Sequence, residues 1–272
     1  MRRRVFRGRS QYRDLLEKES ETFLSHPISR NYPRRSTSTG LHIYGEAAKH
    51  GKRVQCLCEA KNHALVLEDA PIARTAAGII NSSFGCAGER CMALPVVVVQ
   101  ESIADALVEE IVKQVKTKKV GPAYEKDTDL GPVVTAEHKK FVCDWIQKGI
   151  DEGAKVVLDG RDIKVEGYEN GFYVGHTILD HVTEEMTVGQ REIFGPVLCI
   201  KRVKDFEEGL KVMNANPFAN GSVIFTQNGH YAREFAKRTD GGMVGVNVGI
   251  PVPAGMFPFA GHRTRSSATC TA

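Results

Sequence analysis

The hydrophobic pattern from about residue 70 onward alternates between strand-like and helix-like segments. Residues 95–100 (PVVVVQ) form a continuous β-branched run, which is typical of a strand buried on both faces. Shorter runs predict further strands at residues 155–158, 173–179, 197–203, 222–226 and 243–248. Strands that alternate with helices in this way predict an α/β fold with a mainly parallel sheet.

Helical periodicity fills the intervals between these strands. One helix is predicted to begin at Ser102, with Asp105 completing a capping-box pattern. Its apolar positions repeat every three or four residues: Ile103, Leu107, Ile111 and Val115. A second helix is predicted from Thr135, with Gly153 placed to end it. Further helices are predicted at residues 205–214 and 230–237.

Composition and charge narrow the class of protein. The chain has 272 residues, of which 42% are hydrophobic, enough for one large domain or two modest ones. Its net charge is +4, yet residues 1–35 hold ten basic and four acidic side chains, so the remainder is slightly acidic. This distribution gives no reason to expect a nucleic-acid partner. No apolar run approaches the roughly 18 residues of a membrane span, so no membrane partner is expected.

The basic residues 1–35 lack an apolar core and carry acids, which disfavours a targeting peptide. The seven cysteines are dispersed and odd in number, which favours reduced cytosolic thiols. The expected location is the cytoplasm, or the mitochondrial matrix if the source is eukaryotic. The pair Cys56 and Cys58 has no partner pair at zinc-site spacing, so no metal is expected.

Cys91 is the candidate nucleophile. It follows Arg90 in residues 84–94 (FGCAGERCMAL), between a glycine-bearing turn and a buried strand. A cationic neighbour favours the thiolate, which is the reactive form of cysteine. From the local sequence alone, a buried structural cysteine is the alternative interpretation.

Several separated motifs resemble the aldehyde dehydrogenase superfamily, in the order that the family has them. Residues 88–94 (GERCMAL) are similar to the active-site string GQRCMAL of the methylmalonate-semialdehyde dehydrogenase branch, with Glu89 in place of glutamine. The other matching strings are AKNH at 60–63, DLGPVVT at 129–135, EIFGP at 192–196, NPFANG at 216–221, GVNV at 245–248 and PVP at 251–253. The resemblance runs from about Ser36 to about His262.

The resemblance implies roles for individual residues. Cys91 would attack the aldehyde carbon, and after hydride transfer to NAD it would carry the acyl group as a thioester. Its backbone N–H would help to hold the oxyanion. Arg90 would bind the substrate carboxylate through two parallel hydrogen bonds, unless it is an ordinary solvated arginine. Glu192 would accept hydrogen bonds from the nicotinamide ribose, with Phe194 packed beside that ring.

Two further cofactor-binding positions are implied near the start of the matching region. Ser36 falls where the family's glycine- and serine-rich loop meets the cofactor phosphate, although Arg35 replaces the preceding glycine. Cys58 falls where the family approaches the nicotinamide through its backbone, a position where glycine is more usual. Leu57 stands where hydrolytic members have their general-base glutamate, and Glu59 is expected to point elsewhere. Without that base, water attack on the thioester should be slow.

The missing glutamate therefore favours the acylating branch, in which the thiol of coenzyme A accepts the acyl group. The implied reaction is NAD-dependent oxidation of methylmalonate or malonate semialdehyde to propionyl-CoA or acetyl-CoA, with loss of carbon dioxide. The semialdehyde is the expected small-molecule partner. The family forms homo-oligomers, but the strand used for subunit pairing has no counterpart in residues 263–272.

The expected organisation has four parts. Residues 1–35 are an irregular basic segment, residues 36–67 resemble the end of a Rossmann-like NAD-binding domain, residues 68–262 resemble the catalytic domain, and residues 263–272 diverge from the family. We expect a fragment that lacks most of the NAD-binding domain, so an inactive remnant or a subunit-association fragment is the alternative function. A cysteine acyl hydrolase would need a histidine base near Cys91, for which His63 and His262 are the motif-borne candidates.

Overall fold

The computed structural model describes residues 37–52, 54, 56–252, 254, 256 and 262–263. These residues fall into two compact units, one ending at Glu59 and the other spanning Ala60–Arg263. The boundary predicted between residues 67 and 68 comes from the family resemblance and not from compactness, so it stays a prediction. No helix in the described ranges has the length and apolarity needed to cross a bilayer.

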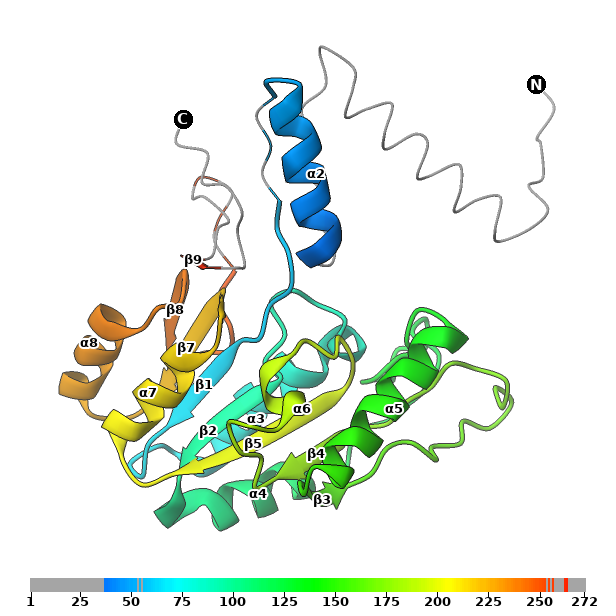
Figure 1. The fold of residues 1–272 in the computed structure, drawn as a ribbon. Helices are drawn as coiled ribbons and strands as arrows, with labels where there is room; N and C mark the ends of the chain where they lie inside the picture. Colours follow the sequence, from blue (N-terminus) through cyan, green and yellow to red (C-terminus); the bar gives the residue numbers. More distant parts are fainter. Residues whose placement is uncertain are drawn as a thin grey trace. The chain divides into compact units, whose positions relative to one another are not determined.

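The larger unit is built on a seven-stranded sheet with the order β3-β4-β5-β2-β1-β7-β8 (Figure 1). Every neighbouring pair is parallel except β3 and β4, which are antiparallel. The strands are β1 (His63–Val66), β2 (Val96–Gln100), β3 (Lys155–Leu158), β4 (Thr177–Asp180), β5 (Val197–Val203), β7 (Gly221–Phe225) and β8 (Met243–Val246). The α/β fold with a mainly parallel sheet is therefore confirmed.

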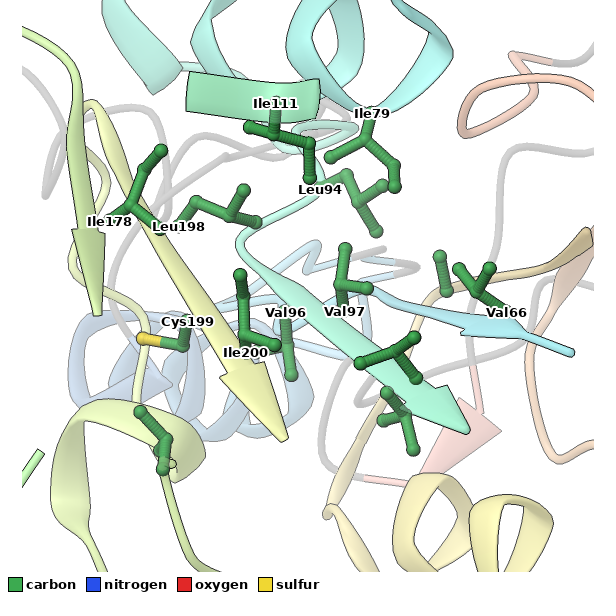
Figure 2. Close-up of a cluster of buried hydrophobic side chains, with 14 of the residues drawn as sticks. Val66, Ile79, Leu94, Val96, Val97, Ile111, Ile178, Leu198, Cys199 and Ile200 are labelled. Carbon is green, nitrogen blue, oxygen red and sulfur yellow. The ribbon is translucent and has the colours of Figure 1, made fainter. Parts of the chain in front are cut away.

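The central strands are apolar on both faces because helices cover both. Helices α3 (Ile72–Phe84) and α4 (Glu101–Val115) pack against each other on one face, whereas α7 (Phe206–Ala215), with α8 (Gly229–Arg238) beside it, packs on the other (Figure 1). Figure 2 shows the core between them, where Val96, Val97, Leu198 and Ile200 lie among side chains from the helices. All four side chains are buried, as the β-branched run predicts.

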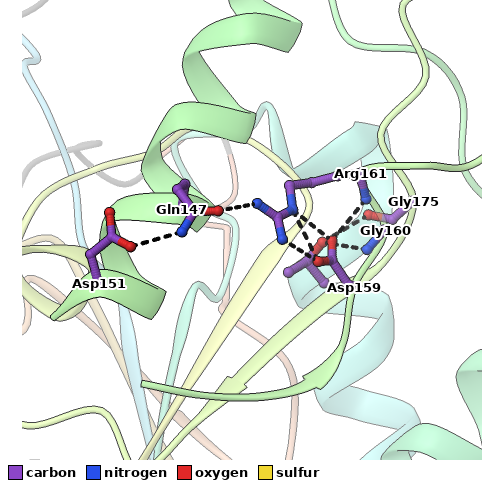
Figure 3. A network of polar contacts seen from close by, with 7 residues as sticks. Gln147, Asp151, Asp159, Gly160, Arg161 and Gly175 are labelled. Carbon is purple, nitrogen blue, oxygen red and sulfur yellow. Dashed lines mark hydrogen bonds and ion pairs between the residues drawn. The ribbon is translucent and has the colours of Figure 1, made fainter. Parts of the chain in front are cut away.

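Helix α5 (Ala136–Asp151) and the short helix α6 (Thr187–Gln190) contact each other near the edge of the sheet. Thr135 caps α5, as predicted, because its hydroxyl oxygen accepts a hydrogen bond from the His138 N–H at 3.0 Å. Figure 3 shows how the turn after β3 is tied to α5: Arg161 binds Asp159 and also donates to Gln147 at 2.8 Å.

Two short features complete the larger unit. The turn that follows α3 is a short 3-10 segment, η1 (Gly85–Gly88), and β6 (Phe218–Ala219) pairs with β9 (His262–Arg263).

The smaller unit contains helix α2 (Thr37–Lys49). One face of α2 buries Gly40, Ile43 and Ala47, and a small cluster joins these apolar positions to the side chains of Val54, Cys56 and Cys58. Gly40 has to be glycine, because a Cβ there would collide with the Cys58 sulfur.

The predicted capping box at the start of α4 is wrong. The helix begins at Glu101, its N-cap is Gln100, and no side chain caps it. Ser102 instead donates a long hydrogen bond of 3.4 Å to Glu68, and Asp105 binds Arg202. Tertiary partners therefore outcompete the local capping pattern at this helix.

Arg202 on β5 joins β4 to α4. Its guanidinium donates to the Asp180 carboxylate at 2.7 Å and to Asp105 and Glu101 at 2.7 and 2.9 Å. The Asp180 side chain is only 2% exposed, so it depends on this pairing.

We expect Arg202→Met to lower the free energy of unfolding by about 2 kcal/mol, because the buried Asp180 carboxylate loses its charged partner but keeps the His181 N–H. Urea unfolding measures the change. Lys204→Met is the matched control, because it removes an exposed cation two residues after Arg202. It should change the free energy of unfolding by less than about 0.5 kcal/mol. Equal losses in the two variants would contradict the expectation.

Candidate active site

A pocket beside Cys91 lies at the amino ends of the parallel strands. Its lining comes from the segments just before β1, β2 and β5, together with the end of α3 and the turn that follows it: Ala60, Asn62, Ser83, Gly88, Arg90, Cys91, Ala93, Pro95, Glu192, Ile193, Phe194 and Gly195. Ligands of open α/β sheets usually bind at the carboxyl ends of the strands. The amino-end position therefore departs from the general rule, and sequence periodicity did not predict it.

Cys91 lies in the turn between η1 and β2, is partly exposed and has a free thiol. Two buried asparagines hold its carbonyl oxygen: Asn62 and Asn220 each donate a side-chain N–H at 3.0 Å. Asn62 also donates to the Ala93 carbonyl at 2.5 Å and accepts from Asn220 and from the Gly221 N–H. These bonds fix the main chain at the Cys91 carbonyl and two residues after it, at Ala93.

Gly88 brings the turn that carries Cys91 against the segment that carries Glu192 and Phe194. Its φ is +69°, and a Cβ there would collide with the carbonyl oxygen of Gly195. Only glycine satisfies both constraints. The two segments are therefore in direct main-chain contact.

Arg90 lines the pocket and reaches back to the end of α3. Its Nη2 donates to the carbonyl oxygens of Asn81 and Ser82, both at 2.9 Å, and these oxygens also accept the main-chain N–H groups of Gly85 and Leu94. Its Nε is buried and has no hydrogen-bond partner within the described part of the chain. The guanidinium is thus anchored on one side and keeps an unused donor, which a ligand oxygen in the pocket could satisfy.

Glu192 and Phe194 both line the pocket, in the segment before β5. The ring of Phe194 is 39% exposed, and its backbone has φ of +56°, a strained value for a residue other than glycine. The Phe194 carbonyl accepts a hydrogen bond from His138 Nε2 at 2.7 Å, and this nitrogen also lies 3.3 Å from Glu89 Oε1. Burial raises the pKa of Glu89, while the Val134 N–H and His138 lower it.

The other predicted residues lie outside this unit or outside the described residues. Ser36 is not among the described residues. Cys58 is buried in the cluster under α2, and Glu59 accepts a hydrogen bond from the Thr37 hydroxyl at 2.5 Å. Leu57 lies in the same unit, partly buried. The carboxylate of Glu59 is therefore engaged at the first residue of α2.

The histidine needed for a hydrolase triad is not found at His63. This residue is 3% exposed, donates from Nδ1 to the Lys61 carbonyl at 2.7 Å, and does not line the pocket. Burial lowers the pKa of His63 to about 3, which leaves it a poor base at neutral pH. The side chain of His262 is outside the described residues.

Asn62 and Asn220 lie within two of the matching strings, but no role was predicted for either residue. No role was predicted for His138 either. The available signal was an asparagine placed just before a buried strand in two separate motifs, because a buried amide at a strand start must find hydrogen-bond partners. That signal does not say which segments the amide joins.

The pocket residues fit one end of a nicotinamide cofactor. The carboxylate of Glu192 can accept hydrogen bonds from ribose hydroxyls, and the exposed ring of Phe194 offers a flat apolar surface beside it. Both lie in the same pocket as the Cys91 thiol. These residues would hold the reacting end of the cofactor close to that thiol.

The chain matches the aldehyde dehydrogenase family over residues 35–268. Malonate-semialdehyde dehydrogenase 1 of Oceanobacillus iheyensis is 46% identical over 242 residues, which cover 89% of this chain and 50% of that protein. The protein of the same name from Bacillus thuringiensis (strain Al Hakam) is 47% identical over 84% of this chain and 47% of its own. The chain spans about half the length of these curated relatives.

Solved structures give the same result for the fold. The methylmalonate-semialdehyde dehydrogenase of Oceanimonas doudoroffii matches with a TM-score of 0.89 and 39% identity, over 92% of this chain and 51% of its own. A Thermus 1-pyrroline-5-carboxylate dehydrogenase with bound NAD matches with a TM-score of 0.82 and 29% identity, over 90% of this chain and 48% of its own. The family match and these relatives together show that the chain belongs to the aldehyde dehydrogenase family.

Proposed function

We propose that this chain carries the catalytic part of an NAD-dependent, CoA-acylating dehydrogenase for methylmalonate or malonate semialdehyde. The observation that carries the proposal is the gathering of Cys91, Arg90, Glu192 and Phe194 around one pocket. A nucleophile, a carboxylate-binding cation and a cofactor-binding pair are the groups that such a reaction requires. The names of the malonate- and methylmalonate-semialdehyde dehydrogenase relatives support the same substrate class.

In the proposed reaction, the thiolate of Cys91 adds to the aldehyde carbon. Asn62 and Asn220 hold the Cys91 carbonyl, so the thiol and the Cys91 N–H, a donor for the developing oxyanion, keep a fixed direction. Bound NAD supplies the hydride acceptor. Cys91 then carries the acyl group as a thioester.

Arg90 sets the preference for a substrate with a carboxylate. Arg90 lines the pocket, its Nη2 is anchored on the α3 carbonyls, and its buried Nε has no hydrogen-bond partner among the described residues, so a carboxylate that reaches this guanidinium gains a charge-assisted hydrogen bond. Leu57 stands in place of a general base, so the thiol of coenzyme A, not water, takes the acyl group. Loss of the carboxylate as carbon dioxide gives propionyl-CoA or acetyl-CoA.

The test is NADH formation by the purified chain with malonate semialdehyde, NAD and coenzyme A. We expect Cys91→Ala to reduce the rate by at least about 10³-fold, because it removes the nucleophile. Cys86→Ala is the matched control: this exposed thiol lies in the same loop and should be dispensable. Omission of coenzyme A should stop turnover after the enzyme is acylated. Absence of NADH from the folded wild-type chain would contradict the proposal.

A further inference from the structure

The geometry points to His138 as a positioning residue: we propose that its Nε2–H locks the turn that carries Cys91 to the segment that carries Glu192 and Phe194. This inference builds on the proposed function, because those two segments hold the proposed nucleophile and cofactor contacts. His138 itself lies at the start of α5, on neither segment. No motif in the sequence assigned it a role.

The protonation pattern of the His138 ring follows from its contacts. The Phe194 carbonyl oxygen can only accept, so Nε2, 2.7 Å away, must carry a hydrogen. The same nitrogen is 3.3 Å from Glu89 Oε1, which is an ion-pair contact and not a second hydrogen bond, so the ring bonds to one acceptor and lies against another. One acceptor lies two residues before Cys91, and the other lies two residues after Glu192.

The Glu89 side chain is also held in place. Its Oε1 also accepts from the Val134 N–H at 3.2 Å, just ahead of α5, and its side chain is only 15% exposed. Glutamine at this position would keep an acceptor oxygen, so the contact depends on an oxygen at this place and not on a full charge. The carboxylate oxygen lies 3.3 Å from His138 Nε2 and so places an acceptor against the polar edge of the ring.

The lock acts on a strained residue. Phe194 has φ of +56°, which costs free energy and has to be held by its surroundings. His138 holds it twice, through the carbonyl oxygen and through an edge-on ring contact with centroids 6.5 Å apart. Without His138, the Phe194 backbone is free to leave the left-handed region, and the Phe194 ring moves with it.

Helix α5 does not need the His138 ring for its own stability. Thr135 caps the helix, and Val142 and Ile146 bury its inner face. The ring of His138 is partly exposed and stacks on Phe141 at the surface. A substitution of His138 should therefore loosen the two locked segments and leave the helix in place.

The experiment compares His138→Leu, which cannot donate, with His138→Gln, whose amide can donate to both acceptors. Two readouts need neither substrate nor cofactor: hydrogen exchange of the amides in residues 192–197, and the rate of Cys91 alkylation by iodoacetamide, followed on the Cys91 peptide. His230→Leu, an exposed histidine on α8, is the matched control.

We expect His138→Leu to speed exchange in residues 192–197 by about tenfold and to change the alkylation rate of Cys91 at least about threefold, as the loss of one hydrogen bond and one polar contact predicts. His138→Gln should restore both values to within about twofold, and His230→Leu should change neither. Glu89→Ala should act like His138→Leu, and Glu89→Gln like the wild type; this pair tests the lock if His138→Leu does not fold.

Unchanged exchange and alkylation in folded His138→Leu would overturn the inference. So would exchange that rises equally along α5, because His138 would then support the helix and not the lock. Because neither readout requires turnover, the inference can stand when the proposed dehydrogenase reaction fails, and can fail when that reaction is found.

Discussion

Replacing Asn62 by leucine should lower the free energy of unfolding by about 4 kcal/mol, the largest effect expected for one side chain near the site. Asn62 is 1% exposed and takes part in four hydrogen bonds that join the starts of β1, β2 and β7. Leucine has a similar size, so the change removes hydrogen bonds without opening a large cavity.

The expected loss comes from the groups that leucine leaves unpaired. The Ala93 carbonyl and the Gly221 N–H would lose their Asn62 partners inside the protein, at about 1–3 kcal/mol each. The Cys91 carbonyl would keep Asn220 as a donor, so the turn would loosen without losing every restraint. Urea unfolding gives the stability, and alkylation of Cys91 reports on the turn.

Asn214→Leu is the matched control for this prediction. Asn214 also bonds to main-chain groups, the Arg238 carbonyl and the Asp240 N–H, but it is partly exposed, so water can replace it. We expect a loss of about 1 kcal/mol there. A loss at Asn62 no larger than the loss at Asn214 would show that the buried network adds nothing to stability.

The second large effect is loss of stability in mild acid. Burial lowers the pKa of His63 to about 3, and burial, opposed in part by Asp129, lowers the pKa of His176 to about 4. Both values lie below the ordinary value of 6.5, so between pH 6.5 and these values the unfolded chain binds protons that the folded chain does not. Stability is therefore fully present above pH 6.5 and is lost as the pH falls.

At pH 5 each histidine should cost about 2 kcal/mol relative to neutral pH, or about 4 kcal/mol together. The measurement is urea unfolding at pH 7 and pH 5 for His63→Gln, His176→Gln and the exposed control His230→Gln. Each of the first two variants should shrink the difference between the two pH values by about 2 kcal/mol, whatever its stability at pH 7. If the double variant of His63 and His176 kept the full difference in unfolding free energy between pH 7 and pH 5, the explanation would be wrong.

The sequence predicts the elements whose signals are local and strong. The β-branched run of β2 and the Thr135 cap of α5 are confirmed because the pattern that predicts each of them lies within a few consecutive residues. Helices α2 and α3 were not predicted. Their glycine, serine and threonine residues weaken helix propensity, and neither begins with a side-chain cap that the structure shows, so packing alone holds them.

In the candidate site, too, the residues with a local signal were predicted and the others were not. Cys91, Arg90, Glu192 and Phe194 were found through motifs, and the structure brings them to one pocket, although their roles stay proposals. The residues that position them were not found. Asn220 lies 158 residues from Asn62 along the chain, and no local pattern encodes a contact across that distance.

That separation has a consequence for how the protein is made. The hydrogen bonds to the Cys91 carbonyl come from Asn62, 29 residues before it, and from Asn220, 129 residues after it. Contacts between such distant parts form late, because a long loop must close first. During synthesis Cys91 is therefore added well before its second restraint exists. The Cys91 turn reaches its final geometry only after the ribosome has added β7 and that strand has paired beside β1.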